Sequence, residues 1–141
     1  MSKLIYTFEE MNEEIKRGVT PNMIEMMDPE IIGFDEETTS AVFRFKIHQW
    51  ELNHRGQVHG GAVSGMFDTS MGFTVVAYSG RNVTTAELEI SYLRPFNDDE
   101  YDFNCTVLHM GRKLARIEAK ACSVKTGKLT ATAHATFAFI E

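Results

Sequence analysis

Cysteine, proline and tryptophan are scarce in this chain of 141 residues, which contains two Cys, three Pro and one Trp. Cys105 and Cys122 lack the paired spacing of a zinc or redox site, so neither a disulfide-rich scaffold nor a zinc module is expected, and both side chains are interpreted as small hydrophobic groups. The low proline content and the absence of repeats exclude fibrous and disordered proteins. A chain of this length forms a stable core without cross-links. We therefore predict a single domain spanning residues 1–141.

Long hydrophobic runs and an excess of basic side chains are also missing. The most apolar stretch, residues 62–78, is interrupted by Asp68 and by glycines, so the sequence predicts neither a membrane-spanning helix nor a membrane partner. The first residues lack the apolar core of a signal peptide, which favours a cytoplasmic protein. With 14 Lys and Arg against 20 Asp and Glu, the net charge of −6 argues against a general nucleic-acid binder.

The hydrophobic pattern changes period along the chain. A short N-terminal helical segment is predicted at about residues 7–27, with a capping box at Thr7–Glu10, a stop at Gly18 and a further turn at Met23–Met27. One long helix is predicted from Gly60 to Tyr78. Period-two alternation predicts strands in five segments, at residues 40–48, 84–95, 101–107, 115–121 and 129–139. The expected α+β fold is an antiparallel sheet curled around one central helix.

The predicted helix has two unlike faces. Gly61, Gly65, Asp68 and Gly72 share one stripe at 100° per residue. The opposite, apolar face is expected to pack on the sheet and carries Val63, Met66, Phe73 and Ala77. Glycine weakens a helix, so the stripe indicates that another backbone or a ligand approaches closely there. Asp68 then has two interpretations, either as the acceptor in a tight helix contact or as a general base or nucleophile.

The start of this helix is a candidate oxyanion site. His59, Gly60 and Gly61 precede the first turn, where unpaired backbone N–H groups stabilise negative charge and two glycines allow a substrate carbonyl to approach. Asp68 lies seven residues beyond Gly61, roughly 10 Å along the axis. One carbonyl cannot reach both groups in the same chain. The spacing therefore predicts an isologous homodimer with the glycine stripes near its two-fold axis and two composite sites.

Three motifs carry a family resemblance. The run Asn53–Gly61, the pair Asp68-Thr69 and the strand Thr84–Pro95 together resemble the hotdog-fold thioesterases of the phenylacetic-acid-pathway type, with a likeness extending from about Ile31 to Phe139. The resemblance implies the hotdog fold, a curled antiparallel sheet wrapped around one long helix. It also implies hydrolysis of acyl-coenzyme A thioesters to free acid and CoA. It further implies homodimers or dimers of dimers that use no metal and no separate cofactor.

The same resemblance implies roles for single residues. Asp68 would activate water as a general base or attack the thioester as a nucleophile, and the Gly60 backbone N–H would form the oxyanion hole. His59 and Asn53 would hold or polarise the thioester. Thr85 would orient the attacking water.

Three of these assignments have an alternative. Strand alternation turns Thr85 away from the apolar face, so Thr84 is the alternative for the water-orienting hydroxyl. A loop-capping amide is the structural interpretation of Asn53, and a helix-entry residue is that of His59.

Basic residues concentrate in one predicted hairpin. Six of the 14 basic residues and one acidic residue lie at 112–128. Lys120, Lys125 and Lys128 are expected on a solvated face, whereas Arg112 and Lys113, beside the turn glycine Gly111, are predicted to bind the phosphates of coenzyme A. Together with Gly61, they are the predicted substrate-binding residues.

Two functions from different classes follow. The first is an acyl-CoA thioesterase, and the alternative is a non-catalytic module on the same fold that binds or senses acyl-CoA. Met23, Met26 and Met27 either line the acyl pocket or pack into the core.

Overall fold

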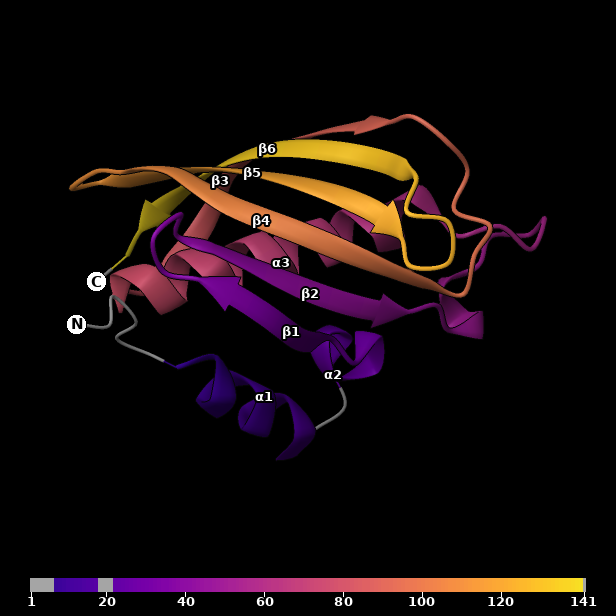
Figure 1. Ribbon diagram of the computed structural model, residues 1–141, viewed down its shortest axis with the longest axis horizontal. Coiled ribbons are helices and arrows are strands. Elements are labelled where there is room, and N and C mark those ends of the chain that lie inside the picture. Colours follow the sequence, from indigo (N-terminus) through magenta and orange to yellow (C-terminus); the bar gives the residue numbers. More distant parts are fainter. Residues whose placement is uncertain (1–6, 18–21, 141) are drawn as a thin grey trace.

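The computed structural model, which describes residues 7–17 and 22–140, places one long helix, α3 (Gly60–Ser79), against a curled antiparallel sheet (Figure 1). Six strands form the sheet in the order β1-β2-β4-β5-β6-β3. Their bounds are β1 Glu30–Asp35, β2 Ser40–Lys46, β3 Val83–Tyr92, β4 Glu100–Met110, β5 Leu114–Ser123 and β6 Leu129–Phe139. The predicted α+β hotdog fold is confirmed. Strand β1 was not among the predicted segments.

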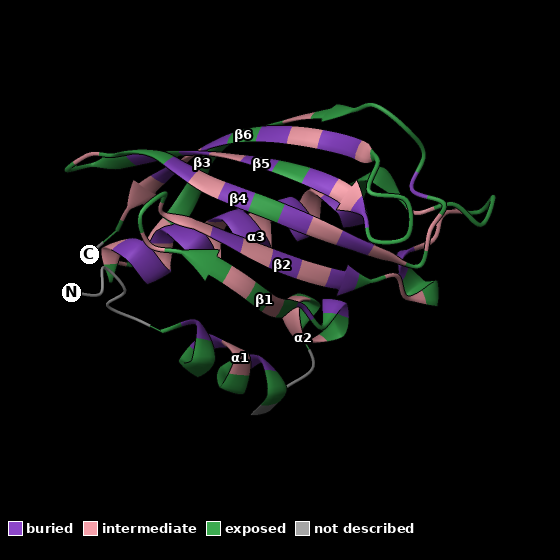
Figure 2. Cartoon of the chain, viewed as in Figure 1, coloured by how far each residue is buried: buried purple, intermediate pink, exposed green. Residues whose placement is uncertain are grey.

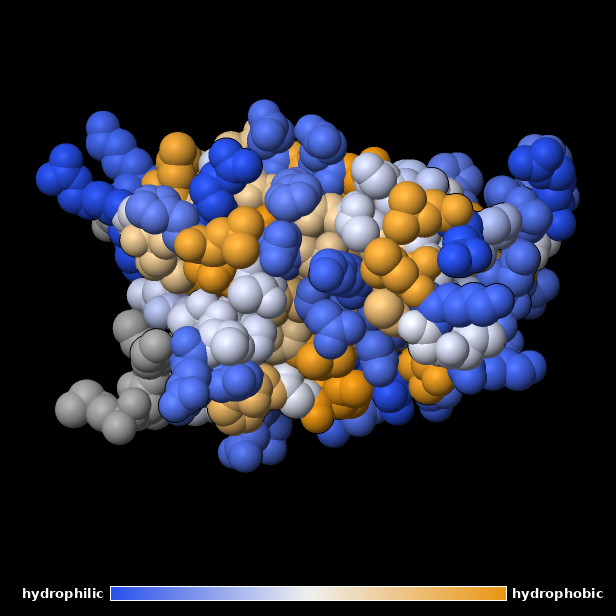
Figure 3. Space-filling view, turned by 45° about the horizontal axis from the view of Figure 1, so that its top comes forward, coloured by the Kyte–Doolittle hydropathy of each residue, from blue (hydrophilic) through white to orange (hydrophobic). Residues whose placement is uncertain are grey.

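The core lies between α3 and the inner face of the sheet. Burial alternates along β4, β5 and β6, as a sheet with one covered face requires (Figure 2). The ring of Phe67 on α3 meets that of Phe103 on β4 edge to face at 4.6 Å between centroids. Val63, Met66 and Ala77 are buried as predicted, whereas Phe73 is only half-buried. Figure 3 shows a face where apolar groups lie in separate patches among hydrophilic ones.

Two short helices, α1 (Phe8–Arg17) and α2 (Met23–Met27), lie beyond strand β1 (Figure 1). The capping box is confirmed, because Glu10 N donates to Thr7 Oγ1 at 3.1 Å and Thr7 N donates to the Glu10 carboxylate at 2.9 Å. Gly18, the predicted stop, lies outside the described residues. In α2, Met27 is fully buried and packs into the core, while Met23 and Met26 are exposed.

Both cysteines are free, and Cys105, on strand β4, is buried in the hydrophobic core. Burial raises the pKa of the Cys105 thiol to about 12, so the group stays protonated and unreactive at pH 8. We expect iodoacetamide at pH 8 to leave Cys105 unmodified in the folded protein and to label it after denaturation, as read by peptide mass spectrometry. Rapid labelling of Cys105 in the native state would contradict this placement.

Strand β3 forms one edge of the sheet and pairs with β6 on its other side. Its side chains are mostly exposed. The ladder with β6 is irregular, because Thr85 pairs with Phe137 and Glu87 with Thr136, so Ala86 is an extra, bulged residue. The bulge changes which residues of β3 face the helix.

Among the residues that the structure describes, no helix is both long and apolar enough to cross a bilayer.

Candidate active site

Asp68 lies in the middle of α3, half-buried, and faces strand β3. Thr85 Oγ1 donates a hydrogen bond to Asp68 Oδ1 at 2.5 Å. The bulge at Ala86 explains this contact. Thr85 pairs with Phe137, a buried residue of β6, so Thr85 shares the inner side of the sheet and Thr84 takes the outer side. The structure therefore brings Thr85, and not Thr84, to Asp68.

The Asp68–Thr85 pair opens into a surface pocket of about 460 Å³. Its walls are mainly apolar and include residues of α2, α3, β3 and β6. Besides the pair, it is lined by Ile24, Thr69, Gly72, Phe73, Val76, Asn82, Val83, Phe137 and Ile140. Asp68 is the one charged side chain among these residues. A carboxylate with a fixed hydroxyl partner in an apolar pocket is an arrangement suited to proton abstraction.

Two glycines of the α3 stripe, Gly65 and Gly72, are covered by side chains of the same chain. A Cβ added at Gly65 would collide with the Cε of Met23, and one at Gly72 would lie 3.3 Å from the ring of Phe137. A close approach does occur at these two glycines, but side chains of α2 and β6 make it, and not the backbone or the ligand that the sequence predicted. The stripe does not by itself indicate the position of a two-fold axis.

The start of α3 is held by backbone and side-chain hydrogen bonds. His59 is the N-cap residue, and its Nδ1 accepts from Gly61 N at 2.8 Å. Its own N–H donates to the carbonyl of Glu51 at 2.8 Å. The Gly60 carbonyl accepts from the Tyr92 hydroxyl at 2.6 Å. In the part of the chain that the structure describes, the Gly60 N–H has no acceptor, which leaves it available as a donor.

Asn53 caps the loop that precedes α3. Its Oδ1 accepts from Arg55 N at 2.9 Å and from Gln57 N at 3.1 Å. The loop-capping interpretation of Asn53 therefore describes its contacts within the chain. Its side-chain amide nitrogen has no hydrogen-bond partner among the described residues.

Gly60 borders a second surface pocket, of about 370 Å³. This pocket is lined by Gln57, Val58, Gly60, Val63, Tyr92, Leu93, Arg94, Pro95 and Phe96. It shares no lining residue with the Asp68 pocket. Gly60 and Asp68 are eight residues apart, roughly 12 Å along the helix axis. Within one chain, the two halves of the predicted site are therefore separate.

Arg112 and Lys113 lie in the turn between β4 and β5, beside the C-terminal end of α3. Arg81, just after α3, donates to the Arg112 carbonyl at 2.9 Å, and its guanidinium lies 4.0 Å from the centre of the Phe139 ring. Figure 1 shows this turn at the opposite end of the molecule from the loop that precedes Gly60. The structure thus does not bring Arg112 and Lys113 to Gly60 of the same chain.

Two polar residues outside α3 contact its start, and the sequence motifs assign neither of them a role. Tyr92 is the last residue of β3, and its hydroxyl donates to the Gly60 carbonyl. Glu51 accepts from the His59 N–H through its backbone carbonyl. Glu51 is 1% exposed, and its Oε1 accepts from His48 N at 2.6 Å and contacts His48 Nδ1 at 3.0 Å. The spacing of His48 and Glu51 is that of a capping box, which could have indicated the short 3₁₀ helix η1 (Gln49–Glu51).

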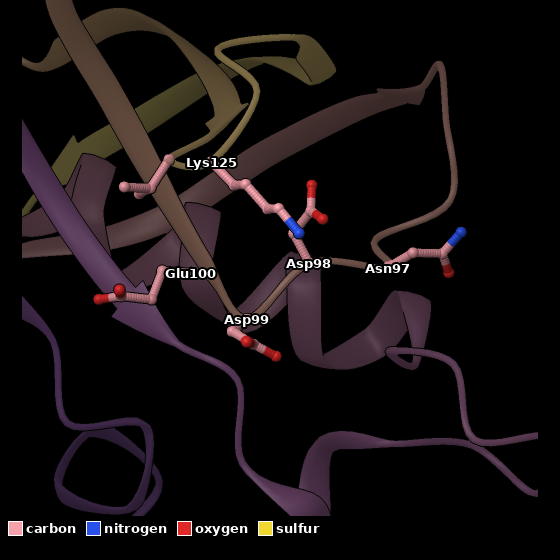
Figure 4. Close-up of a pocket in the computed structure, with 6 residues that line it drawn as sticks. Asn97, Asp98, Asp99, Glu100 and Lys125 are labelled. Atoms are coloured by element: carbon pink, nitrogen blue, oxygen red, sulfur yellow. The ribbon is translucent and has the colours of Figure 1, made fainter.

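A further hollow of about 290 Å³ lies at the acidic turn between β3 and β4. Lys125 extends toward Asp98 there, and none of the predicted site residues lines it (Figure 4). Ser123 Oγ donates to Asp98 Oδ2 at 2.5 Å, which ties the turn to β5. Among the described residues, no three His, Cys, Asp or Glu side chains are grouped so that they could hold a metal ion.

Comparison with protein families gives one match, to the thioesterase superfamily, over residues 55–136. The matched range covers more than half of the chain and contains both Gly60 and Asp68. A search of curated proteins gave no match.

Solved structures share the fold over most of the chain. A phenylacetic acid degradation-related protein from Ralstonia eutropha is 26% identical, covers 94% of this chain and 99% of its own, and has a TM-score of 0.78. A conserved protein from Pseudomonas aeruginosa is also 26% identical, with 89% and 98% covered and a TM-score of 0.77. A hypothetical thioesterase from Streptococcus pneumoniae, solved with coenzyme A, is 22% identical, with 79% and 85% covered and a TM-score of 0.72.

Proposed function

Because the chain belongs to the thioesterase superfamily, we propose that it hydrolyses an acyl-coenzyme A thioester to the free acid and CoA. The observation that carries this proposal is the Asp68–Thr85 hydrogen bond in the wall of a mainly apolar pocket of about 460 Å³, which is large enough for an acyl group. Coenzyme A as the carrier is supported by the similar fold of the Streptococcus pneumoniae protein, which was solved with that molecule.

We assign Asp68 the role of general base. The Thr85 hydroxyl donates its only proton to Asp68 Oδ1, so the Thr85 oxygen is left to act as an acceptor. A water molecule that donates a hydrogen bond to this oxygen is held beside the Asp68 carboxylate. Asp68 takes a proton from this water as the oxygen attacks the thioester carbonyl. The carbon–sulfur bond then breaks, and the proton passes to the leaving CoA thiolate. Asp68 supplies the base itself, so the proposed reaction requires no resident metal or cofactor.

The oxyanion of the tetrahedral intermediate is assigned to the Gly60 N–H. This group lies at the positive end of α3, has no acceptor among the described residues and borders a pocket. His59 accepts from Gly61 through Nδ1, so the proton of its neutral ring is on Nε2, where it can donate to the thioester. The side-chain amide nitrogen of Asn53, which has no partner among the described residues, is also assigned to the thioester group of the substrate.

The distance between Gly60 and Asp68 supports a site made by two chains. Strand β3 is the exposed edge that connects the two pockets, because Thr85 borders the Asp68 pocket and Tyr92 borders the Gly60 pocket. Antiparallel pairing of two β3 strands about a two-fold axis would place the Thr85 end of one opposite the Tyr92 end of the other. It would also cover the exposed edge. We propose a homodimer of this kind with two composite sites, and dimers of dimers remain compatible with it.

A composite site also gives a function to the basic turn. Arg112 and Lys113 lie at the C-terminal end of α3, far from Gly60 of their own chain. In the antiparallel dimer, this end of one protomer comes near the Gly60 end of its partner. We propose that the two cations meet the phosphates of a CoA whose thioester lies at the partner's helix start.

Mixed dimers test the composite site directly. Asp68→Asn removes the base and Gly60→Pro removes the oxyanion donor, so each homodimer is expected to be inactive. When the two variants are co-expressed in equal amounts, half of the dimers are mixed and each has one intact site, giving about one quarter of the wild-type rate. The hydrolysis rate of the purified mixture is measured by thiol release and compared with that of the wild type. No recovery would mean that Gly60 and Asp68 act within one chain.

A thiol-release assay over short-chain, long-chain and aromatic acyl-CoA substrates tests the proposed reaction. We expect turnover with at least one apolar acyl group, because the Asp68 pocket has no second charge to pair with a charged acyl chain. A folded protein that hydrolyses none of them would overturn the proposal. Thermal stabilisation by acyl-CoA without hydrolysis would instead support a binding module.

A further inference from the structure

A continuous chain of hydrogen bonds ends on the ring of His59. Tyr92 donates to the Gly60 carbonyl at 2.6 Å. The Ser64 hydroxyl lies 3.1 Å from the same carbonyl and 2.9 Å from the Tyr92 hydroxyl, so its one proton can go to either oxygen. That carbonyl belongs to the same peptide group as the Gly61 N–H, which donates to His59 Nδ1 at 2.8 Å. The polar atoms thus connect strand β3 to the His59 ring through a single peptide bond.

Each bond in this chain strengthens the next. A hydroxyl that donates to a carbonyl withdraws electrons from the peptide and makes its N–H a better donor. The Gly61 N–H then holds the lone pair of His59 Nδ1 more firmly. A ring that accepts at Nδ1 keeps its proton on Nε2 and points that N–H away from the helix.

The position of Tyr92 fits this role. Its side chain is 48% exposed and borders the pocket beside Gly60. A Cβ added at Gly60 would lie 3.6 Å from the Tyr92 hydroxyl, so the side chain packs directly over the helix start. The same strand holds Thr85 against Asp68 at its other end. One edge strand thus positions groups in both pockets.

We propose that Tyr92, supported by Ser64, is a positioning residue that acts through the Gly60–Gly61 peptide to fix the tautomer and orientation of His59. This inference rests on the proposed function for its kinetic consequence, since His59 donates to the thioester only when Nε2 carries the proton. The geometry of the hydrogen-bond chain does not depend on that function.

Tyr92→Phe is the variant that tests the proposal, because it keeps the ring over Gly60 and removes only the hydroxyl. We expect kcat to fall about three- to tenfold, as for the loss of one hydrogen bond, with KM within about twofold of wild type. ¹⁵N NMR of the His59 ring is expected to show a single Nε2–H tautomer in the wild type and a mixture of tautomers in Tyr92→Phe. Ser64→Ala is expected to change both readouts in the same direction and by less.

Tyr78→Phe is the matched control. Tyr78 also donates to a backbone carbonyl, that of Ser40 at 2.8 Å, but near the opposite end of α3. We expect this variant to lose stability without changing the His59 tautomer or kcat.

Unchanged His59 ring shifts in a folded Tyr92→Phe would overturn the proposal, and so would an equal tautomer change in Tyr78→Phe. A wild-type protein that shows no turnover would overturn the proposed function, while the NMR comparison would still decide the role of Tyr92.

Discussion

Replacement of Asp68 by Asn is expected to lower kcat by about 10²- to 10⁴-fold, the range that a positioned general base contributes. The amide has the size of the carboxylate and keeps an oxygen that can accept from Thr85, so the half-buried site on α3 is preserved. What is lost is the ability to take a proton from water. The measurement is thiol release from the best substrate of the acyl-CoA panel under saturating conditions.

The control for this variant is Asp99→Asn. Asp99 is exposed in the turn between β3 and β4 and lines neither the Asp68 nor the Gly60 pocket. Its substitution by Asn is the same chemical change at a position away from the proposed site. We expect it to retain wild-type activity. Thermal unfolding and gel filtration of both variants show whether fold and assembly are kept. Near-wild-type activity in Asp68→Asn would mean that the base lies elsewhere.

Replacement of Gly60 by Pro is expected to lower kcat by about 10²- to 10³-fold, the usual effect of removing one oxyanion donor. Proline has no backbone N–H, and the first position of a helix tolerates it because that N–H has no partner in the helix. The preceding residue, His59, already has the extended conformation that a following proline requires, with φ −66° and ψ 133°. The change therefore removes the donor while the helix start is kept.

Gly60→Ala is the matched variant, because alanine restores the N–H and adds only a Cβ. That Cβ would lie 3.6 Å from the Tyr92 hydroxyl, an ordinary van der Waals distance. We expect most of the activity to remain in Gly60→Ala. Equal losses in the two variants would show that side-chain volume at this position matters rather than the N–H. An active, folded Gly60→Pro would move the oxyanion donor to another residue.

The long helix and five of the strands could be predicted because their signals are local. Alternation over β4, β5 and β6 follows directly from one buried and one exposed face. The limits of α3 are set by the N-cap His59 and by Gly80, whose φ of 68° ends the helix. Such signals depend on neighbouring residues in the sequence, so the sequence alone is sufficient to read them.

Features set by tertiary contacts could not be predicted in this way. Strand β1 is a short edge strand with a glycine and a register shift, which blur its alternation. The glycine stripe on α3 indicated a close approach, but the identity of the approaching groups, Met23 and Phe137, depends on how distant segments pack.

The candidate site shows the same division. Asp68 and the helix start could be identified from their positions on α3, and the family resemblance pointed to Thr85. Strand alternation instead favours Thr84. The bulge at Ala86, which reverses this choice, arises from the pairing of β3 with β6 and leaves no local signal in the sequence. Hydrogen bonds such as that from Tyr92 to Gly60 join residues 32 positions apart and have no local signature.

The bulge in β3 also decides which side chain lies opposite Phe137. Without the extra residue, Ala86 would pair with Phe137, and Thr84 would lie opposite Phe139, two positions further along β6. The position that Thr85 now occupies would then carry an alanine, which has no hydroxyl to donate to Asp68. A one-residue slip of this edge strand would therefore remove the proposed water-binding group, so the site depends on the register of β3 as well as on the residues that the strand carries.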